Sequence, residues 1–246
     1  PAGIQLFGDR DERESMFFRT TSIPCYKASM HAHAKRCLAL CLAGILMAAQ
    51  ALTASDAGSV APVTRDMRAL QDNAGKGDAK SQNALGEIYA QGIGVKKNPS
   101  QAAYWFRKAA QQDYAKAQYN LGQLYYAGDG LPRDFQEAVY WFNKAANLGD
   151  TDAQNALGKC YEEGSGVEQD YTSAAKWYKL AANQGHTSAQ ANFGNLVENG
   201  LGMPRDYKTA FLFYQLSAIK GNPKGQYGLG NMYRTGQGVQ SDTTLA

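Results

Sequence analysis

Residues 84–110 read ALGEIYAQGIGVKKNPSQAAYWFRKAA, and this stretch recurs along the chain with a strict period of 36 residues. Further copies of its first half are NLGQLY at 120–125, ALGKCY at 156–161, NFGNLV at 192–197 and GLGNMY at 228–233. Further copies of its second half are AVYWFNKAA at 138–146, AAKWYKLAA at 174–182 and AFLFYQLSA at 210–218. A fixed period of this length is typical of proteins built from stacked supersecondary units.

Apolar residues within each copy are spaced three and four positions apart. Leu85, Ile88 and Tyr89 show this spacing in the first half, and Trp105 and Ala109 show it in the second. Such spacing indicates two amphipathic helices per copy, because residues three or four apart share one face of a helix. The sequence therefore predicts an all-α fold, a right-handed α-solenoid of 36-residue antiparallel helix pairs.

A Gly-x-Gly turn follows every first half, as Gly92 and Gly94 do in the first copy. We expect the first glycine of each turn to end its helix in the left-handed conformation. An Asp or Asn six residues later is suited to cap the next helix. These predicted caps are Asn98, Asp134, Asp170, Asp206 and Asp242.

A glycine also lies inside every first helix, where it costs roughly 1 kcal/mol relative to alanine. A residue repeated at that cost is expected to allow a close approach of the paired helix. The glycines are Gly86, Gly122, Gly158, Gly194 and Gly230. The aromatic residues predicted to cover them from the second helices are Trp105, Trp141, Trp177 and Phe213.

The combined pattern, A-x-x-x-LG-x-x-Y-x-x-G-x-GV-x-x-D-x-x-x-A-x-x-W-[YF]-x-K-A-A-x-x-G, resembles the Sel-one-like repeat family, a branch of the tetratricopeptide superfamily. The resemblance covers residues 77–246 as four full repeats and a truncated fifth. It implies a solenoid that binds other macromolecules. Fold and function are separate questions, however, so the resemblance does not identify a partner.

The part of the chain before the repeats divides into three predicted segments. Residues 1–29 are interpreted as an upstream extension of the reading frame. Residues 30–54 resemble a secretory signal peptide, with a basic start, a short apolar run and the triplet Ala49-Gln50-Ala51. That run is too short for a stable membrane span. Residues 55–76 are predicted to hold a linker and a degenerate capping helix, and the mature chain is expected to be periplasmic or secreted.

Composition and charge argue against several classes of function. The chain carries 25 Lys+Arg and 22 Asp+Glu, so it lacks the basic excess typical of nucleic-acid-binding proteins. After the signal segment only one histidine, His186, and one cysteine, Cys160, remain. We therefore expect no cofactor, no metal site and no intramolecular disulfide. His186 is predicted to be an exposed turn residue, and Cys160 a small core residue.

One enzymatic pattern is present, because Ser173 and Lys176 match the S-x-x-K element of serine β-lactamases. Its companion S-D-N and K-T-G elements are absent, so an accidental match is favoured. The chain is thus not expected to be an enzyme. A β-lactamase-like hydrolase of the cysteine-rich type found among relatives of this repeat family stays an alternative hypothesis.

Function is instead expected where the repeats differ from one another. Polar and tyrosine side chains of the first helices are predicted to line the concave face and to bind a protein or peptide. These residues are Asn83, Glu87, Tyr119, Gln123, Tyr126, Asn155, Lys159, Glu162, Asn195, Tyr227, Asn231 and Arg234. The sequence favours an exported scaffold or adaptor, with a role in envelope assembly or polysaccharide export implied by the resemblance. A secreted factor that acts on host proteins is a further alternative.

Overall fold

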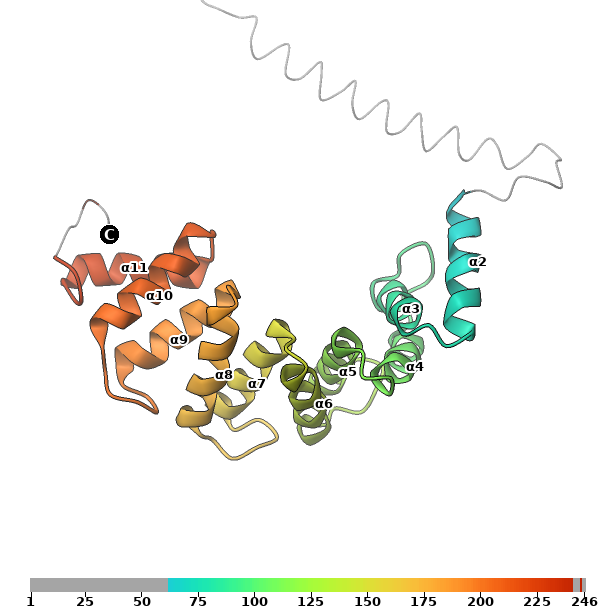
Figure 1. Ribbon diagram of the computed structural model, residues 1–246, viewed down its shortest axis with the longest axis horizontal. Helices are drawn as coiled ribbons and strands as arrows, with labels where there is room; N and C mark the ends of the chain where they lie inside the picture. The colour runs from blue at the N-terminus through green and yellow to red at the C-terminus, as the bar shows by residue number, and fades with distance from the viewer. Residues whose placement is uncertain (1–61, 241–243, 245–246) are drawn as a thin grey trace, which may run out of the picture. The chain divides into compact units, whose positions relative to one another are not determined.

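The computed structural model describes residues 62–240 and residue 244, and this part of the chain contains ten α-helices and no strand (Figure 1). The helix before the repeats is α2 (Pro62–Gly75). The first helices of the repeats are α3 (Ala79–Gln91), α5 (Ala115–Ala127), α7 (Thr151–Glu163), α9 (Thr187–Asn199) and α11 (Pro223–Thr235). The second helices are α4 (Pro99–Ala110), α6 (Phe135–Asn147), α8 (Tyr171–Asn183) and α10 (Tyr207–Ile219).

Each helix packs mainly against the helix before it and the helix after it, so the described part of the chain is built from successive helix pairs (Figure 1). This arrangement confirms the predicted all-α solenoid. No helix among the described residues combines the length and apolar character needed to cross a bilayer. The predicted signal segment and the upstream extension lie outside the described residues.

The turns between paired helices follow the predicted capping chemistry. Gly92 ends α3 with a φ of 77°, and its N–H donates to the carbonyl of Ile88. The side chain of Asn98 then accepts a hydrogen bond from the N–H of Gln101 at the start of α4. The same pair of caps recurs in the following three repeats. The predicted cap Asp242 lies outside the described residues.

The aromatic residue that covers the mid-helix glycine is not the predicted one. A methyl group on Gly122 would lie 2.6 Å from a ring carbon of Phe142, the residue that follows Trp141. The equivalent rings over Gly86, Gly158 and Gly194 belong to Phe106, Tyr178 and Tyr214. The prediction that Trp105, Trp141, Trp177 and Phe213 cover the glycines is therefore wrong.

The tryptophans serve the stacking of one repeat on the next instead. Trp141 is partly buried against the cluster that α4 and α5 form, which includes Ala109 and Leu121. Trp177 packs in the same way against the following cluster, from α6 and α7. Phe142 and Tyr178 thus join the two helices of one repeat, whereas Trp141 and Trp177 before them pack at the boundary between repeats.

A buried glutamine ties each first helix to the helix before it. The side-chain amides of Gln82, Gln118, Gln154 and Gln190 donate to the carbonyls of Ala74, Ala110, Ala146 and Ala182 at 3.0, 3.1, 3.1 and 3.2 Å. Because Ala74 belongs to α2, that helix occupies the position of a second helix before the first repeat. The glutamine ladder was not predicted from the sequence, although its members recur with the period.

The ladder alternates between two forms. The side-chain oxygens of Gln82 and Gln154 each accept a second bond, from Gln112 at 2.7 Å and Gln184 at 2.8 Å. The oxygens of Gln118 and Gln190 are buried without a partner. The position of Gln112 and Gln184 is taken by Leu148 in repeat two, and leucine cannot donate a hydrogen bond. In repeat four it is taken by Lys220, whose ammonium donates to the carbonyl of Gly185 instead.

A buried tyrosine hydroxyl in repeats three and four requires an acidic partner. Tyr178 donates to Glu162 and Tyr214 to Glu198, both at 2.6 Å. Burial raises the pKa of both tyrosines, and the neighbouring carboxylates raise it further. Repeat one has Phe106 at the position of the tyrosine and Ala90 at the position of the glutamate. The tyrosine hydroxyl and its carboxylate partner are thus both present in repeats three and four and both absent in repeat one.

We predict that Gly122→Ala lowers the free energy of unfolding by about 1–3 kcal/mol, because the methyl group would overpack the ring of Phe142. This outcome opposes the helix propensity of alanine, which favours the variant by roughly 1 kcal/mol. Gly75→Ala is the control, since nothing lies within 4 Å of a methyl group there. Urea unfolding measures both variants, and an unchanged or higher stability for Gly122→Ala would contradict the packing argument.

We also predict that Tyr178→Phe destabilises the chain by about 1–3 kcal/mol, because the carboxylate of Glu162 loses its hydrogen bond in a partly buried position. Tyr178→Phe combined with Glu162→Ala recreates the pair that repeat one uses and should cost clearly less than the sum of the two single changes. Urea unfolding of the three variants measures this coupling. Additive losses would show that the two groups act independently.

Candidate functional site

The first helices of repeats two and three enclose a pocket of about 120 Å³. Its walls come from α5 and α7, with contributions from α6 and from the residue that precedes α9. The lining residues are Tyr119, Gln123, Tyr126, Phe142, Asp152, Asn155, Ala156, Lys159 and His186. Five of the predicted partner-binding residues therefore meet at one place, namely Tyr119, Gln123, Tyr126, Asn155 and Lys159.

Aromatic rings form the apolar part of the pocket. Tyr126 meets Phe135 edge to face at a centroid distance of 5.0 Å, and it lies 6.4 Å from Phe142. Tyr119 lies 5.9 Å from Phe142 on the other side. Tyr126 takes the position that Glu162 has in the next repeat, and Phe142 has no hydroxyl that would need such an acid. In repeat two, the aromatic pair Tyr126 and Phe142 therefore takes the place of the buried tyrosine–glutamate pair.

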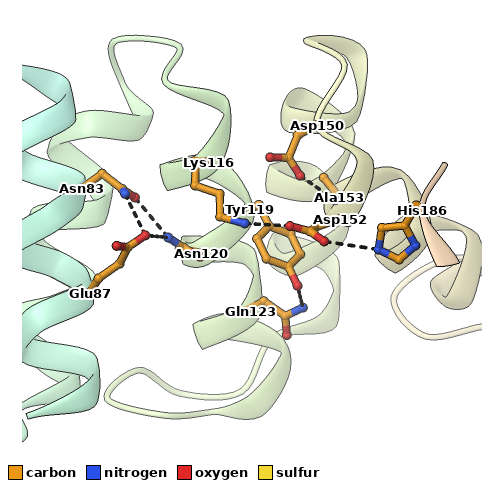
Figure 2. A network of polar contacts seen from close by, with 10 residues as sticks. All are labelled: Asn83, Glu87, Lys116, Tyr119, Asn120, Gln123, Asp150, Asp152, Ala153 and His186. Carbon is orange, nitrogen blue, oxygen red and sulfur yellow. Dashed lines mark hydrogen bonds and ion pairs between the residues drawn. The ribbon is translucent and has the colours of Figure 1, made fainter. Parts of the chain in front are cut away.

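A chain of three polar side chains, two of which line the pocket, joins three successive repeats (Figure 2). The Lys116 ammonium donates to Asp152 at 2.7 Å, and the other oxygen of Asp152 lies 3.2 Å from Nε2 of His186. The Nδ1 atom of His186 accepts from the N–H of Ala189 at 3.0 Å, which makes His186 the N-cap of α9. Nδ1 therefore carries no proton, and Nε2–H donates to Asp152.

The prediction of an exposed His186 is wrong, since its side chain is only 16% exposed. His186 does lie in the turn between repeats, as predicted. Its position corresponds to that of the capping residues Asp78 and Asp150, and histidine replaces aspartate where the carboxylate of Asp152 is close by. A second aspartate at that position would repel Asp152, whereas the imidazole can donate to it.

The polar chain shifts the ionisation of its members. Burial alone would raise the pKa of Asp152, but the hydrogen bond and charge of Lys116 and the hydrogen bond from His186 lower that pKa below its ordinary value. Burial would lower the pKa of Lys116, and Asp152 raises it instead. Burial raises the pKa of Tyr119, whose hydroxyl accepts from Gln123 at 2.8 Å. Asp152 and Lys116 are thus held as an ion pair across the repeat boundary.

Other predicted residues form bonds among themselves on the first helices. Asn83 is buried, and its amide donates to Glu87 at 2.9 Å (Figure 2). Asn120 donates to Asn83 at 3.0 Å and so links repeats one and two. Asn155 accepts from Asn192 of the next repeat at 3.0 Å. Cross-repeat bonding is therefore one physical role of these amides, whether or not they also contact a partner.

The remaining predicted residues lie outside the pocket. Glu162 accepts from Tyr178 in its own repeat, as described above. Asn195 is partly buried on α9, and Asn231 accepts from Arg234 at 3.3 Å. Tyr227 is 74% exposed. These four positions of repeats four and five do not share a cavity with the pocket between α5 and α7.

The structure gives the possible catalytic residues ordinary structural roles. Cys160 is fully buried, as predicted, and burial raises its pKa to about 12, so the thiol stays protonated at neutral pH. Ser173 donates to the N-cap Asp170 at 2.6 Å and so completes the start of α8. Among the described residues, no three His, Cys, Asp or Glu side chains converge in a way that could hold a metal ion.

The chain is similar to solved structures of bacterial repeat proteins. It is 37% identical to a protective antigen with an SLR fold from uropathogenic Escherichia coli, with a TM-score of 0.70 over 73% of this chain and 38% of that one. It is 35% identical to a Sel1 repeat protein from Oxalobacter formigenes, with a TM-score of 0.67 over 72% of this chain and 73% of that one. The chain thus spans well under half of the Escherichia coli protein. No curated protein matches the chain significantly.

A more distant structure supports the fold alone. A sel1 repeat protein from Klebsiella pneumoniae is 21% identical, with a TM-score of 0.51 over 73% of this chain and 87% of that one.

The model of the Sel1 repeat family matches residues 79–114, 115–150, 151–186, 187–222 and 223–246. These matches follow the period found in the sequence without a gap. The chain belongs to the Sel1 repeat family.

Proposed function

We propose that this Sel1 repeat chain is a scaffold or adaptor that binds a protein or peptide along its first helices, with the pocket between α5 and α7 as the central anchor site. One observation carries the proposal. Five side chains at positions that vary between otherwise regular repeats line one pocket, which has an aromatic wall. Binding energy tends to concentrate in such a central cluster of aromatic and polar residues.

The chemistry of the pocket suits an apolar side chain held by a peptide backbone. The rings of Tyr119, Tyr126 and Phe142 offer apolar contact area, and the side chains of Gln123 and Asn155 can pair with backbone groups of a bound segment. Lys159 lies at the rim, 3.7 Å from Glu163 and 5.6 Å from the ring centroid of Tyr126. A peptide with one large apolar residue between polar ones fits this arrangement.

No catalytic role is proposed. The hydroxyl of Ser173 serves the cap of α8, and Lys176 belongs to the exposed face of the same helix. The matching S-x-x-K spacing arises because Ala174 and Ala175 are the buried repeat alanines between them. The β-lactamase-like hypothesis therefore has no structural support beyond the spacing itself.

We predict that Tyr126→Ala combined with Asn155→Ala weakens capture of the partner by more than tenfold, about 1.4 kcal/mol. The two changes remove ring area and an amide from the pocket, while the buried core stays intact. The partner is captured from the periplasmic fraction of the producing cell, identified by mass spectrometry and then titrated in purified form. Circular dichroism and the melting temperature verify that the double variant is folded.

Tyr140→Ala is the matched control, because this tyrosine is half exposed on the second helix α6. Arg107, on the second helix α4, is less suitable as a control, because its guanidinium donates to the hydroxyl of Tyr125 in the next repeat at 2.9 Å. Loss of capture in the Tyr140 variant, with normal capture by the pocket variant, would place binding on the second helices and contradict the proposal.

We further propose that the chain is exported by the segment 30–54 and acts in the bacterial periplasm, in envelope assembly or polysaccharide export. This segment lies outside the described residues, and its basic start and short apolar run support the proposal. The likeness to a protective antigen favours an exported protein as well. Action on host proteins after secretion is the alternative, for which finding the chain in the culture medium would be the evidence.

Export predicts cleavage close to Ala51 or Ala54. The intact mass of the protein recovered from the periplasmic fraction should therefore lack residues 30–50. Lys35→Glu combined with Arg36→Glu should block processing and leave the precursor in the cell, because the basic start of a signal peptide directs it to the export machinery. A mature mass that retains residues 30–50 would contradict the proposal.

A further inference from the structure

The second helix of repeat four exposes three aliphatic side chains at positions where repeats one and two have Tyr, Lys and Gln or Asn. Leu212, Leu216 and Ile219 are spaced by four and three residues on α10, so they share one face, and they are 56, 48 and 77% exposed. Leu180 takes the position of Leu216 one period earlier, on α8, and is 44% exposed. Exposed apolar side chains grouped in this way mark an interaction surface.

Repeats one and two show what normally covers these positions. Lys108 takes the position of Leu180, and its ammonium lies 4.8 Å from the ring centroid of Tyr104 and 5.6 Å from that of Trp105. Lys144 lies 5.5 Å from the rings of Tyr140 and Trp141 in the same way. In repeats three and four a leucine replaces the lysine, so this cationic cover is missing.

A cavity of about 250 Å³ lies between α8 and the turn that precedes α10. Phe193, Met203 and Ala175 provide its apolar lining, and Lys176 and Lys179 provide its cationic lining. The ammonium of Lys179 lies 6.0 Å from the ring centroid of Phe193. The cavity can therefore take an apolar side chain whose neighbours are negatively charged.

The charge of this surface has one sign. Helices α8 and α10 contain no acidic residue, whereas Lys176, Lys179, Lys208 and Lys220 are exposed on or directly after them. Within the described part of the chain none of these four lysines forms an ion pair. The nearby carboxylates, Asp170 and Asp206, accept hydrogen bonds at the helix starts. An acidic partner would meet no repelling group on either helix.

We propose that the stripe of Leu212, Leu216 and Ile219 on α10 docks an acidic amphipathic helix of a partner protein, with Leu180 and the cavity beside α8 as further contacts. The stripe on α10 runs for two turns, which matches the apolar face of a helix laid against it. The flanking lysines meet the acidic residues beside that face. This second surface lies on helices other than those of the pocket, so the chain can hold two proteins at once.

The same features disfavour other occupants. A second copy docked by two-fold symmetry would bring lysines against lysines, because both partners would present the same residues. A lipid surface can also bind a leucine stripe flanked by lysines, but it has no protruding side chain to fill the cavity lined by Phe193 and Met203. The observations thus favour an acidic helix over a copy of the chain or a membrane.

The test titrates the purified chain into a fluorescently labelled synthetic helix with Leu at alternating third and fourth positions and Glu elsewhere. We expect binding by fluorescence anisotropy that weakens as salt screens the lysines. Leu212→Gln with Leu216→Gln and Ile219→Gln should weaken binding by about tenfold or more, without a change in melting temperature. Tyr104→Gln with Tyr140→Gln, at the positions of Leu212 in repeats one and two, should leave binding unchanged.

Other results would overturn the proposal. These are absence of binding up to about 1 mM, equal binding of a peptide with Lys in place of Glu, and binding of phosphatidylglycerol vesicles but not of the peptide. The pocket variant Tyr126→Ala with Asn155→Ala separates the two surfaces and should bind the acidic helix normally. If that variant alone loses the peptide, the helix binds in the pocket and the surface on α8 and α10 is not its site.

Discussion

The contact between a glycine in one helix and an aromatic ring in the next sets how closely the two helices of each repeat approach. With no side chain at Gly86, Gly122, Gly158 or Gly194, the ring of the second helix rests directly on the backbone of the first. In repeats two and three the neighbouring tryptophan, Trp141 or Trp177, packs against the repeat before it. The ring therefore packs the two helices of one repeat together, and the tryptophan packs one repeat against the next. The solenoid depends on both contacts.

The period and its glycine turns were sufficient to predict the helix pairs and their caps, because capping depends on residues a few positions apart. The choice between Trp105 and Phe106 as the residue over Gly86 was different. Both are large and apolar, they point in directions about 100° apart on the helix, and the pattern alone cannot say which direction faces the partner helix. The role of the buried glutamines could not be predicted for a related reason. Their amides donate to backbone carbonyls, and a pattern of side chains does not show where those carbonyls lie.

Much of the candidate site could be predicted from deviations from the repeat. Tyr126 replaces a glutamate and Phe142 replaces a tyrosine, and these two changes together convert a buried polar pair into an aromatic wall. The burial of His186 could not be predicted, because a histidine in a turn is usually solvated, whereas here it contacts Asp152 of the previous repeat. That proximity depends on how repeats stack, which the local sequence does not contain.

The alternation in the glutamine ladder makes the array uneven along its length. In a solenoid, stability is approximately a sum of repeat terms and nearest-neighbour junction terms. At Gln82 and Gln154 the side-chain oxygen accepts a hydrogen bond from another glutamine, whereas at Gln118 and Gln190 this oxygen is buried without a donor. A stretching force would therefore meet weaker and stronger junctions in turn. Partial unfolding would then proceed in blocks of repeats rather than one repeat at a time.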